Sequence, residues 1–530
     1  MRVPSRLAAV REMHQPDADK SARWQMRYDV IVVGGGMGGL TSAALLARAG
    51  KKVVVVEEEG LPGGHARAIY EGGRTHDSAV HLITRCGATG PFGRGVIDTL
   101  LRHLGVHDRV ELLPVGNPFY TLQTPDLRVA VPTGRDAFID AHARLFPDER
   151  DGLRRLVELS AQISNEVSTF PERPRLRDLL MARWRTPMLY QYRKATLQQI
   201  LDRELRDPRL RAVYSALWSW LGSPPWRASF IVWADMMAQY IEGGAYYVRG
   251  GFQSLANAVV DALERAGGEL IVGRRATKIV TREGRVRGVM LEAGEQLEAP
   301  EVISNVDPRT TFGELVSDEP AARRELRKIN RLELSLSAVL AYLATRLDVA
   351  ALGVAHESMY ARSLDLRREW DAALAGEVPL LTVTIPTITD PSLAPAGQHV
   401  VMLAAAAPQR DRVSEPELAE RMLATAEHVV PGLRDHVAAV VGAPAGQQQL
   451  ALRRLEAIYG AAMTPSQIGV GRPGHDTPIH GLHLVGQGTR PGVGVPYVME
   501  SGIQVARELL GRSAAADQLP HFTTPVAAPA

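Results

Sequence analysis

The first strongly patterned region of the chain predicts a strand–turn–helix–strand unit. Residues 28–33 read YDVIVV, a continuous apolar run typical of a strand buried on both faces. The glycine-rich segment 34–39 follows directly, and residues 40–49 are good helix formers that end at Gly50. A second apolar run at 53–56 predicts the next strand. The pattern is typical of the first half of a parallel α/β sheet.

The turn of this unit carries the spacing of a dinucleotide-binding site. G-x-G-x-x-G falls on Gly34, Gly36 and Gly39, and Glu57 follows the second strand, 18 residues after Gly39. The glycines permit a tight turn and close approach of backbone to a pyrophosphate, and the helix N-terminus offers N–H donors to the phosphates. Glu57 can accept a hydrogen bond from a ribose 2′-hydroxyl and disfavours a 2′-phosphate. A glycine-rich turn without a ligand is the weaker interpretation.

A second glycine-rich segment, which contains a Gly-Gly doublet, follows Glu57. Residues 60–67 read GLPGGHAR, which places Gly64, His65 and Arg67 shortly after the second strand. Another flexible backbone segment with a nearby cation suits one long, extended dinucleotide. The segment therefore favours FAD over NAD, and a simple surface turn is the alternative.

Near the C-terminus a strand–loop–helix pattern returns. Residues 483–485 predict a short strand, 486–496 a glycine-rich loop, and 497–510 a helix whose N–H donors could face a flavin ring. The nucleotide-binding domain is therefore expected to be discontinuous. Its three pieces are predicted at 28–115, 245–312 and 455–512.

Two long inserts separate these pieces, at 116–244 and 313–454. The first begins with strand-like runs at 119–123 and 128–132 and then becomes mainly helical. In the second, strands are predicted at 333–342, 380–388 and 399–405, and a helix at 416–430. We expect an α/β protein in which a Rossmann-like domain carries a mixed-sheet substrate domain and a helical lid. Segments 1–27 and 513–530 are expected to be flexible.

Composition narrows the possible functions. Of the 530 residues, 45% are apolar and 23% charged, as in a soluble globular protein. Because 61 Lys and Arg balance 59 Asp and Glu, the chain has no global field to hold a nucleic acid. The single cysteine, Cys86, excludes disulfides and CxxC sites within the chain, and we expect it to be buried. No apolar run approaches the roughly 18 residues that span a bilayer, and a cytoplasmic location is expected.

Three further stretches carry a family resemblance. They are 247–255 (YVRGGFQSL), 302–308 (VISNVDP) and 481–496 (GLHLVGQGTRPGVGVP). Together with 28–67 they resemble the flavoproteins that include amine oxidases and Rab GDP-dissociation inhibitors. Within that group the chain is most similar to the phytoene desaturase, carotenoid isomerase and retinol saturase branch. The resemblance implies FAD and an FAD-dependent oxidoreductase.

The resemblance also implies contacts to FAD. Ala276 corresponds to a backbone position beside the adenine end, and Gly486, Gln487 and Val495 lie in the loop that would face the flavin. Two positions depart from the family pattern. His65 stands where many relatives have arginine after the glycine doublet, and Gln487 stands where aspartate is frequent.

The segment 74–81 passes beside flavin and substrate in relatives. Asp77 and His81 are therefore candidate catalytic groups, and a structural strand with locally satisfied polar groups is the equally favoured alternative. A metal is not expected, because the intervals among the histidines here and at His480 and His483 match no ligand signature.

Aromatic and basic residues are concentrated in the first insert. Five of the seven tryptophans are Trp184, Trp218, Trp220, Trp226 and Trp233. The neighbouring cations are Arg173, Arg175, Arg177, Arg183, Arg185, Arg193 and Lys194. This composition favours a lid that associates reversibly with a membrane surface. The alternative is an ordinary helical subdomain with a solvated basic face.

These features and the resemblance favour desaturation of carbon–carbon bonds in a long apolar polyene or isoprenoid. The flavin would perform the chemistry, and the sequence shows no evident acid–base pair. A carotenoid cis–trans isomerase and a retinol-saturase-type reductase remain alternatives. An amine oxidase would need an aromatic cage for which we see no signature. A prenyl-lipid carrier without catalysis is disfavoured by the intact phosphate turn with Glu57. The oligomeric state is not predicted.

Overall fold

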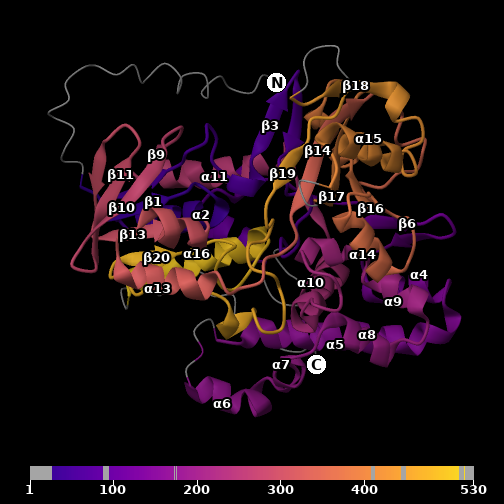
Figure 1. Ribbon diagram of the computed structural model, residues 1–530, viewed down its shortest axis with the longest axis horizontal. Coiled ribbons are helices and arrows are strands. Elements are labelled where there is room, and N and C mark those ends of the chain that lie inside the picture. The colour runs from indigo at the N-terminus through magenta and orange to yellow at the C-terminus, as the bar shows by residue number, and fades with distance from the viewer. Residues whose placement is uncertain are drawn as a thin grey trace.

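The computed structural model describes residues 27–87, 95–171, 174, 176–407, 412–442, 449–511 and 519 (Figure 1). The predicted strand–turn–helix–strand unit is confirmed as β1 (Val30–Val33), α2 (Met37–Arg48) and β2 (Val53–Val56). Every residue of both strands is buried, as their continuous apolar sequences require. The segments expected to be flexible lie outside the described residues, except for Arg27 and Leu519.

A five-stranded parallel sheet forms the nucleotide-binding part of the fold. Its order is β20-β13-β1-β2-β9, so its strands come from three distant parts of the chain. The added strands are β9 (Glu269–Ile271), β13 (Glu301–Ser304) and β20 (Leu482–Leu484). Because the strands are parallel, their carboxyl ends meet at one edge, where ligands bind in open α/β sheets.

Different elements cover the two faces of this sheet (Figure 1). Val30 and Val32 pack in the core that contains α2, α11 (Phe252–Arg265) and α16 (Val495–Leu510). Ile31 and Val33 pack in a second core on the opposite face. That core includes β10 (Ala276–Arg282), β11 (Arg285–Leu291), β12 (Gln296–Glu298) and α13 (Pro320–Ile329).

Helices α2 and α16 cross at a contact between glycines. A Cβ on Gly502 would lie 2.3 Å from the carbonyl oxygen of Gly38 and 3.0 Å from the amide nitrogen of Ser42. A Cβ on Gly38 would lie 2.9 Å from the carbonyl oxygen of Val498. The two backbones therefore touch directly, which brings the first turns of both helices together.

The inserts form a second, eight-stranded sheet. Its main order is β18-β14-β17-β16-β15-β6-β7, and β19 pairs with β14 beside this path. The sheet is mixed because β6 runs parallel to β15 while the other pairs are antiparallel. The strands are β6 (Tyr120–Gln123), β7 (Arg128–Val131), β14 (Ala338–Thr345), β15 (Glu357–Ala361), β16 (Leu380–Thr384), β17 (His399–Ala406), β18 (Val437–Val440) and β19 (Arg453–Leu455).

In the second insert two predicted strands have wrong bounds, and strands β15, β18 and β19 were not predicted. The strand expected at 333–342 begins only at Ala338, and the one expected at 380–388 ends at Thr384. Pro386, which lacks an N–H group, begins a 3₁₀ turn there. Strand β15 reads ESMYA, which shows neither an apolar run nor alternation, although all five residues are buried.

The first insert continues as the expected helical region, which extends along the lower part of Figure 1 from α6, left of centre, to α4 at the right. Its helices are α4 (Arg135–Ala143), α5 (Arg150–Thr169), α6 (Leu176–Arg185), α7 (Pro187–Tyr192), α8 (Leu197–Glu204), α9 (Pro208–Tyr214) and α10 (Phe230–Gly243). The remaining elements are β3 (Ala68–Glu71), β4 (Arg74–Asp77), α3 (Val96–Leu104), β5 (Leu112–Pro114), β8 (Tyr246–Val248), α12 (Pro308–Thr310), α14 (Leu366–Leu374) and α15 (Glu415–Ala426). Among the described residues, no helix has both the length and the apolar character needed to cross a membrane.

The aromatic cluster is mostly internal. Trp218 and Trp233 are buried, and only Trp184 among the five clustered tryptophans is strongly exposed, at 66%. Arg173 and Arg175, which belong to the basic stretch, lie outside the described residues. Cys86 is buried as expected.

The contact between α2 and α16 yields a stability prediction. We expect Gly502→Ala to lower the melting temperature, because overpacking such a contact costs about 1–3 kcal/mol. Gly60→Ala is the matched control, since a Cβ at Gly60 meets no atom within 4 Å. Differential scanning fluorimetry measures both variants, and equal melting temperatures would contradict the close contact.

Candidate functional site

One large cavity of about 1650 Å³ opens at the carboxyl edge of the parallel sheet. Its wall includes the turn after β1, the end of β2, the loop before α16, and side chains from the helical insert. The volume exceeds the ~300–1,000 Å³ of ordinary small-molecule pockets. The cavity therefore has room for a dinucleotide and a second large ligand.

Most residues expected to contact FAD line this cavity. They are Gly34, Gly36, Glu57, Gly64, His65, Arg67, Ala276, Gly486, Gln487 and Val495. Gly39 is not part of the wall. A Cβ there would lie 2.5 Å from the carbonyl oxygen of Gly34 and 3.0 Å from Cγ1 of Val32, so Gly39 is needed for close packing of α2 on β1.

The two glycine segments face each other across a short backbone bridge. The amide of Gly63 donates to the carbonyl of Gly35 at 2.7 Å, and Gly36 pairs with Gly63. Gly63 and Gly64 have φ values of 122° and 60°, which only glycine adopts readily. Two segments separated in the sequence thus form one continuous wall of bare backbone.

The N-terminus of α2 is shaped to receive an anion. Its N-cap residue, Gly36, makes no side-chain capping bond, so the first N–H groups of the helix are not capped by a side chain. The helix dipole adds partial positive charge at the same place. Helix α16 has the same arrangement, with Gly494 as an N-cap that makes no side-chain bond. The wall thus contains two helix N-termini, from α2 and α16.

Glu57 is held at the end of β2 by backbone donors. Its Oε2 accepts from the amide of Gly35 at 2.6 Å, and its Oε1 accepts from the amide of Glu59 at 2.9 Å. Burial raises the pKa of this carboxyl and outweighs the opposing effect of these hydrogen bonds. The carboxylate is oriented before any ligand arrives, as a ribose-binding acceptor requires.

Arg67, the cation predicted to lie near the dinucleotide, forms an ion pair with a neighbouring glutamate. Nη1 of Arg67 lies 3.0 Å from Oε2 of Glu59. Burial, followed by the charges of Arg453 and Arg67, lowers the pKa of His65, so this ring is neutral. At pH 7 this position therefore carries no charge.

Asn305 is a cavity residue to which the sequence interpretation assigned no role. It follows β13, and its Nδ2 would lie 2.5 Å from a Cβ placed on Gly36. Its Oδ1 would lie 2.6 Å from a Cβ on Gly486. Asn305 thus fills the space between the N-terminal turn and the C-terminal loop. The sequence signal that could have identified Asn305 was its position directly after β13, the strand that pairs with β1.

Asp77 and His81 have different surroundings. Asp77 does not line the large cavity; its carboxylate accepts from the hydroxyl of Tyr247 and from the amide of Phe252, which begins α11. Burial raises its pKa to about 6. His81 does line the cavity, with its ring centroid 5.3 Å from that of Trp220. Its Nδ1 lies 3.1 Å from Oε2 of Glu357, a residue absent from the sequence expectations.

A cluster of polar side chains lies near the start of α16. Nη1 of Arg85 lies 3.0 Å from Oε2 of Glu500, and the hydroxyl of Tyr497 donates to Asp235 at 2.6 Å. Asp235 also accepts from the hydroxyl of Ser164 at 2.6 Å. All five residues line the cavity and link α16 to helices α5 and α10.

The wall farther from the sheet is largely apolar. It is lined by Val167, Phe170, Pro171, Leu179, Ala182, Leu189, Trp220, Ile231, Val232 and Met236. These residues come from the helical insert, including α6. One end of the cavity thus resembles a phosphate cradle and the other an apolar channel.

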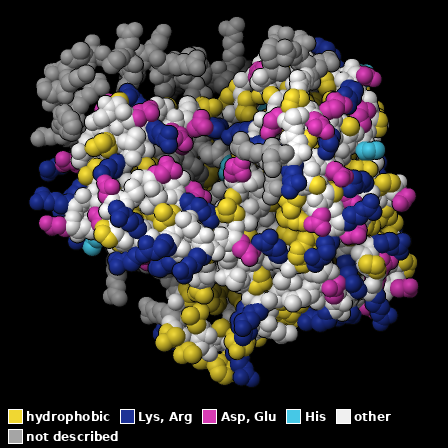
Figure 2. Space-filling view, viewed as in Figure 1, with side chains coloured by type: hydrophobic (Ala, Val, Ile, Leu, Met, Phe, Trp, Pro, Cys, Tyr) yellow, Lys and Arg dark blue, Asp and Glu magenta, His cyan; other side chains and the backbone are white. Residues whose placement is uncertain are grey.

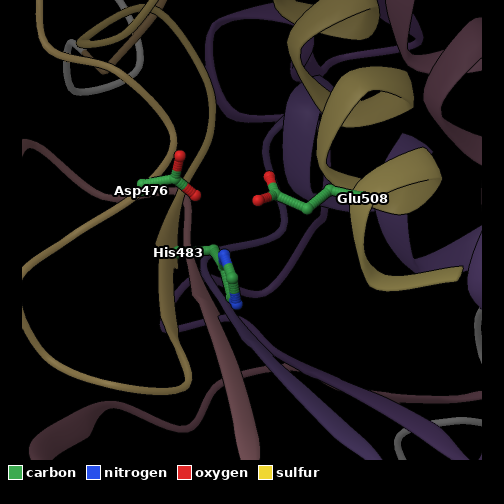
Figure 3. A group of neighbouring side chains, drawn as sticks. All are labelled: Asp476, His483 and Glu508. Atoms are coloured by element: carbon green, nitrogen blue, oxygen red, sulfur yellow. The ribbon is translucent and has the colours of Figure 1, made fainter. Parts of the chain in front are cut away.

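Three potential metal ligands converge elsewhere (Figure 3). Asp476, His483 and Glu508 each place a ligand atom within 4.8 Å of the others. Nε2 of His483 also lies 3.0 Å from Oε2 of Glu301. None of these side chains lines the cavity, so the cluster takes no part in its chemistry.

Comparison with known proteins identifies the family. Residues 37–510 match the family described as flavin containing amine oxidoreductase. The chain belongs to this family. A lycopene-forming phytoene desaturase from Paracoccus sp. is 28% identical over 476 residues, covering 86% of this chain and 92% of the relative. The chloroplastic prolycopene isomerase 1 of an Oncidium hybrid cultivar is 28% identical over 516 residues, covering 91% and 84%.

Solved structures show the same fold. An oxidoreductase from Methanosarcina mazei has a TM-score of 0.62 at 20% identity and covers 90% of this chain and 99% of its own. A putrescine oxidase has a TM-score of 0.62 at 15% identity, with coverage of 92% and 100%. The expected α/β flavoprotein fold and the family resemblance are confirmed. The protein is an FAD-dependent oxidoreductase.

The phosphate turn yields a binding prediction. We expect Gly36→Val to weaken FAD binding about tenfold to a hundredfold, because the side chain fills the cradle at a cost of ~1–3 kcal/mol. The control is Gly116→Val, since a Cβ at Gly116 meets no atom within 4 Å and the residue lies outside the cavity wall. Flavin absorbance and titration with FAD measure both variants. Unchanged affinity in Gly36→Val would place the pyrophosphate elsewhere.

Proposed function

We propose that the protein desaturates carbon–carbon bonds of a long apolar polyene or isoprenoid. The observation that carries the proposal is the continuity of the cavity, which joins the dinucleotide cradle to an apolar channel through the helical insert. The names of the curated relatives, a phytoene desaturase and a prolycopene isomerase, support the same substrate class.

The residues of the cradle would hold FAD in an extended form. Gly36 and Gly64 admit the pyrophosphate, Glu57 accepts from a ribose hydroxyl, and the N-terminus of α16 faces the flavin end. Bound FAD supplies the redox chemistry by accepting a hydride from carbon. The apolar channel would orient the substrate and exclude water.

The second candidate is a redox-neutral isomerase, because the prolycopene isomerase is as similar to this chain as the phytoene desaturase, at 28% identity each. The two functions differ in electron balance. Desaturation transfers two electrons to FAD for every double bond formed, whereas isomerisation leaves the oxidation state of the substrate unchanged.

Anaerobic mixing with purified substrates tests the proposal. We expect phytoene-like polyenes to bleach the flavin absorbance, with one flavin reduced for each new double bond, because the acceptor cannot be reoxidised. Product analysis by chromatography measures the new double bonds. Geometric isomers formed without loss of flavin absorbance would establish the isomerase instead. Reduction of the flavin by small amines, with no reduction by any polyene, would contradict both proposed functions.

We also propose that α6 rests on a membrane surface and receives the substrate there. Hydrophobic side chains gather at the bottom of Figure 2, over the region of α6 and α7. Leu176, Leu180 and Trp184 follow one another at intervals of four along α6 and are 73%, 66% and 66% exposed. Leu179, on the same helix, is both 41% exposed and part of the cavity wall. An apolar substrate could therefore pass from lipid into the channel.

Basic side chains accompany this apolar stripe. Arg177, Arg183 and Arg185 are exposed on α6, and Arg193 and Lys194 are exposed at the end of α7. Each cation near an anionic surface contributes about 1 kcal/mol and is screened within a Debye length. The apolar stripe would add a part of the binding that salt does not remove.

Liposome co-sedimentation separates these two contributions. We expect the wild type to bind anionic vesicles, with weaker binding at high salt. Leu180→Ser combined with Trp184→Ser should remove the salt-resistant part, whereas Arg183→Gln combined with Arg185→Gln should weaken binding at low salt. Leu352→Ser, at an exposed leucine of the second insert, is the control. If the wild type stays in the supernatant at low salt, the helix does not bind membranes.

A further inference from the structure

His81, in the wall of the cavity, forms an ion pair with a glutamate that lies behind the wall. Nδ1 of His81 lies 3.1 Å from Oε2 of Glu357, and the Glu357 side chain is completely buried. His81 retains 20% exposure of its side chain and lines the cavity. Nδ1 is buried beside this carboxylate, and part of the remaining ring is exposed.

Neighbouring groups fix this geometry. The hydroxyl of Thr384 donates to Oε2 of Glu357 at 2.7 Å. Nε2 of His356 lies 3.2 Å from the carbonyl oxygen of His81, and Trp220 meets the His81 ring edge to face. These contacts hold the carboxylate beside the imidazole, and the negative charge next to Nδ1 favours a proton on that nitrogen.

Such a pair is costly as a purely structural device. Removing a carboxylate from water carries a desolvation penalty that ion pairing often fails to recover, and apolar residues of similar volume would fill the wall at no such cost. A carboxylate that orients Nδ1 while leaving Nε2 accessible is, in contrast, the arrangement of a histidine that accepts protons. His81 lines the same cavity as the flavin cradle.

We propose that His81 is the base that removes a proton from the substrate during desaturation, and that Glu357 is the residue that positions it. The inference rests on the proposed function. One C–H bond of the substrate breaks with its electron pair leaving to FAD as a hydride. The adjacent C–H bond breaks with its electrons forming the new π bond, and its proton goes to Nε2 of His81. The substrate loses two electrons and FAD gains them.

The charges around the ring determine the pH at which it can act. Burial lowers the pKa of His81, but the carboxylate of Glu357 and the charge of Asp77 outweigh burial and raise the pKa above its ordinary value. His356, Tyr240 and Tyr459 are neutral at pH 7, because burial lowers the pKa of His356 to about 4 and raises the pKa values of the two tyrosines above their ordinary value. The base form of His81 therefore appears as pH rises through this raised pKa, and the rate should rise with it.

Two substitutions separate the base from its positioning partner. We expect His81→Gln to slow anaerobic flavin reduction by a polyene at least about a hundredfold, the usual contribution of a general base, with flavin content unchanged. Glu357→Gln should slow it less and shift the pH profile to lower pH, because the pKa-raising effect of Glu357 is lost and only the smaller effect of Asp77 then opposes burial. His107→Gln, at an exposed histidine outside the cavity, is the control.

Histidine-ring NMR of the holoenzyme provides a readout that does not depend on turnover. The resonance of His81 is the one that is absent from the spectrum of His81→Gln. This resonance should titrate above pH ~6.5 in the wild type and below pH ~6.5 in Glu357→Gln. If polyenes reduce the flavin of the wild type and of His81→Gln at the same rate, the proposed role of His81 is wrong and the proposed function stands. An unshifted pH profile and NMR titration in Glu357→Gln would overturn the role of Glu357. If no polyene reduces the wild-type flavin, the proposed function is wrong, and the role of His81 as its base is then wrong as well.

Discussion

The direct backbone contact between α2 and α16 is the constraint on which the site depends. At Gly38 and Gly502 the two helices approach more closely than any side chain would allow. Their first turns consequently converge at the carboxyl edge of the parallel sheet, and each offers uncapped N–H groups and a positive dipole end. The phosphate turn of the N-terminal region and the glycine loop of the C-terminal region thereby become walls of one cavity, although about 450 residues separate them.

The inserts give this cofactor site its second half. The helical insert adds an apolar wall to which the partly exposed Leu179 of α6 contributes, and the mixed sheet places the buried Glu357 behind His81. The complete burial of the Glu357 side chain strengthens its interaction with His81.

Local signals account for what could be predicted. Gly34, Gly36 and Glu57 lie within one strand–helix–strand unit, so their spacing along the chain already implies their spacing in space. The C-terminal loop carries its own glycine pattern and was recognised for the same reason. The strand bounds at 333–342 and 380–388 were less predictable, because pairing partners and Pro386, rather than local composition, determine where β14 begins and β16 ends. The membrane-facing role expected for Trp218 and Trp233 failed because tertiary packing buries both.

The sequence by itself determined the cofactor class, the α/β fold and the residues of the phosphate turn, since a dinucleotide is bound mainly by backbone within one short unit. Only the tertiary structure decided which polar groups meet. It placed Asp77 against Tyr247 and the start of α11, and it placed His81 against Glu357, 276 residues later in the chain. No spacing rule connects His81 to Glu357, because the pair forms only when the segment after β4 packs against a strand of the other sheet. Side-chain pairs between distant strands depend on register and packing, which one sequence does not reveal.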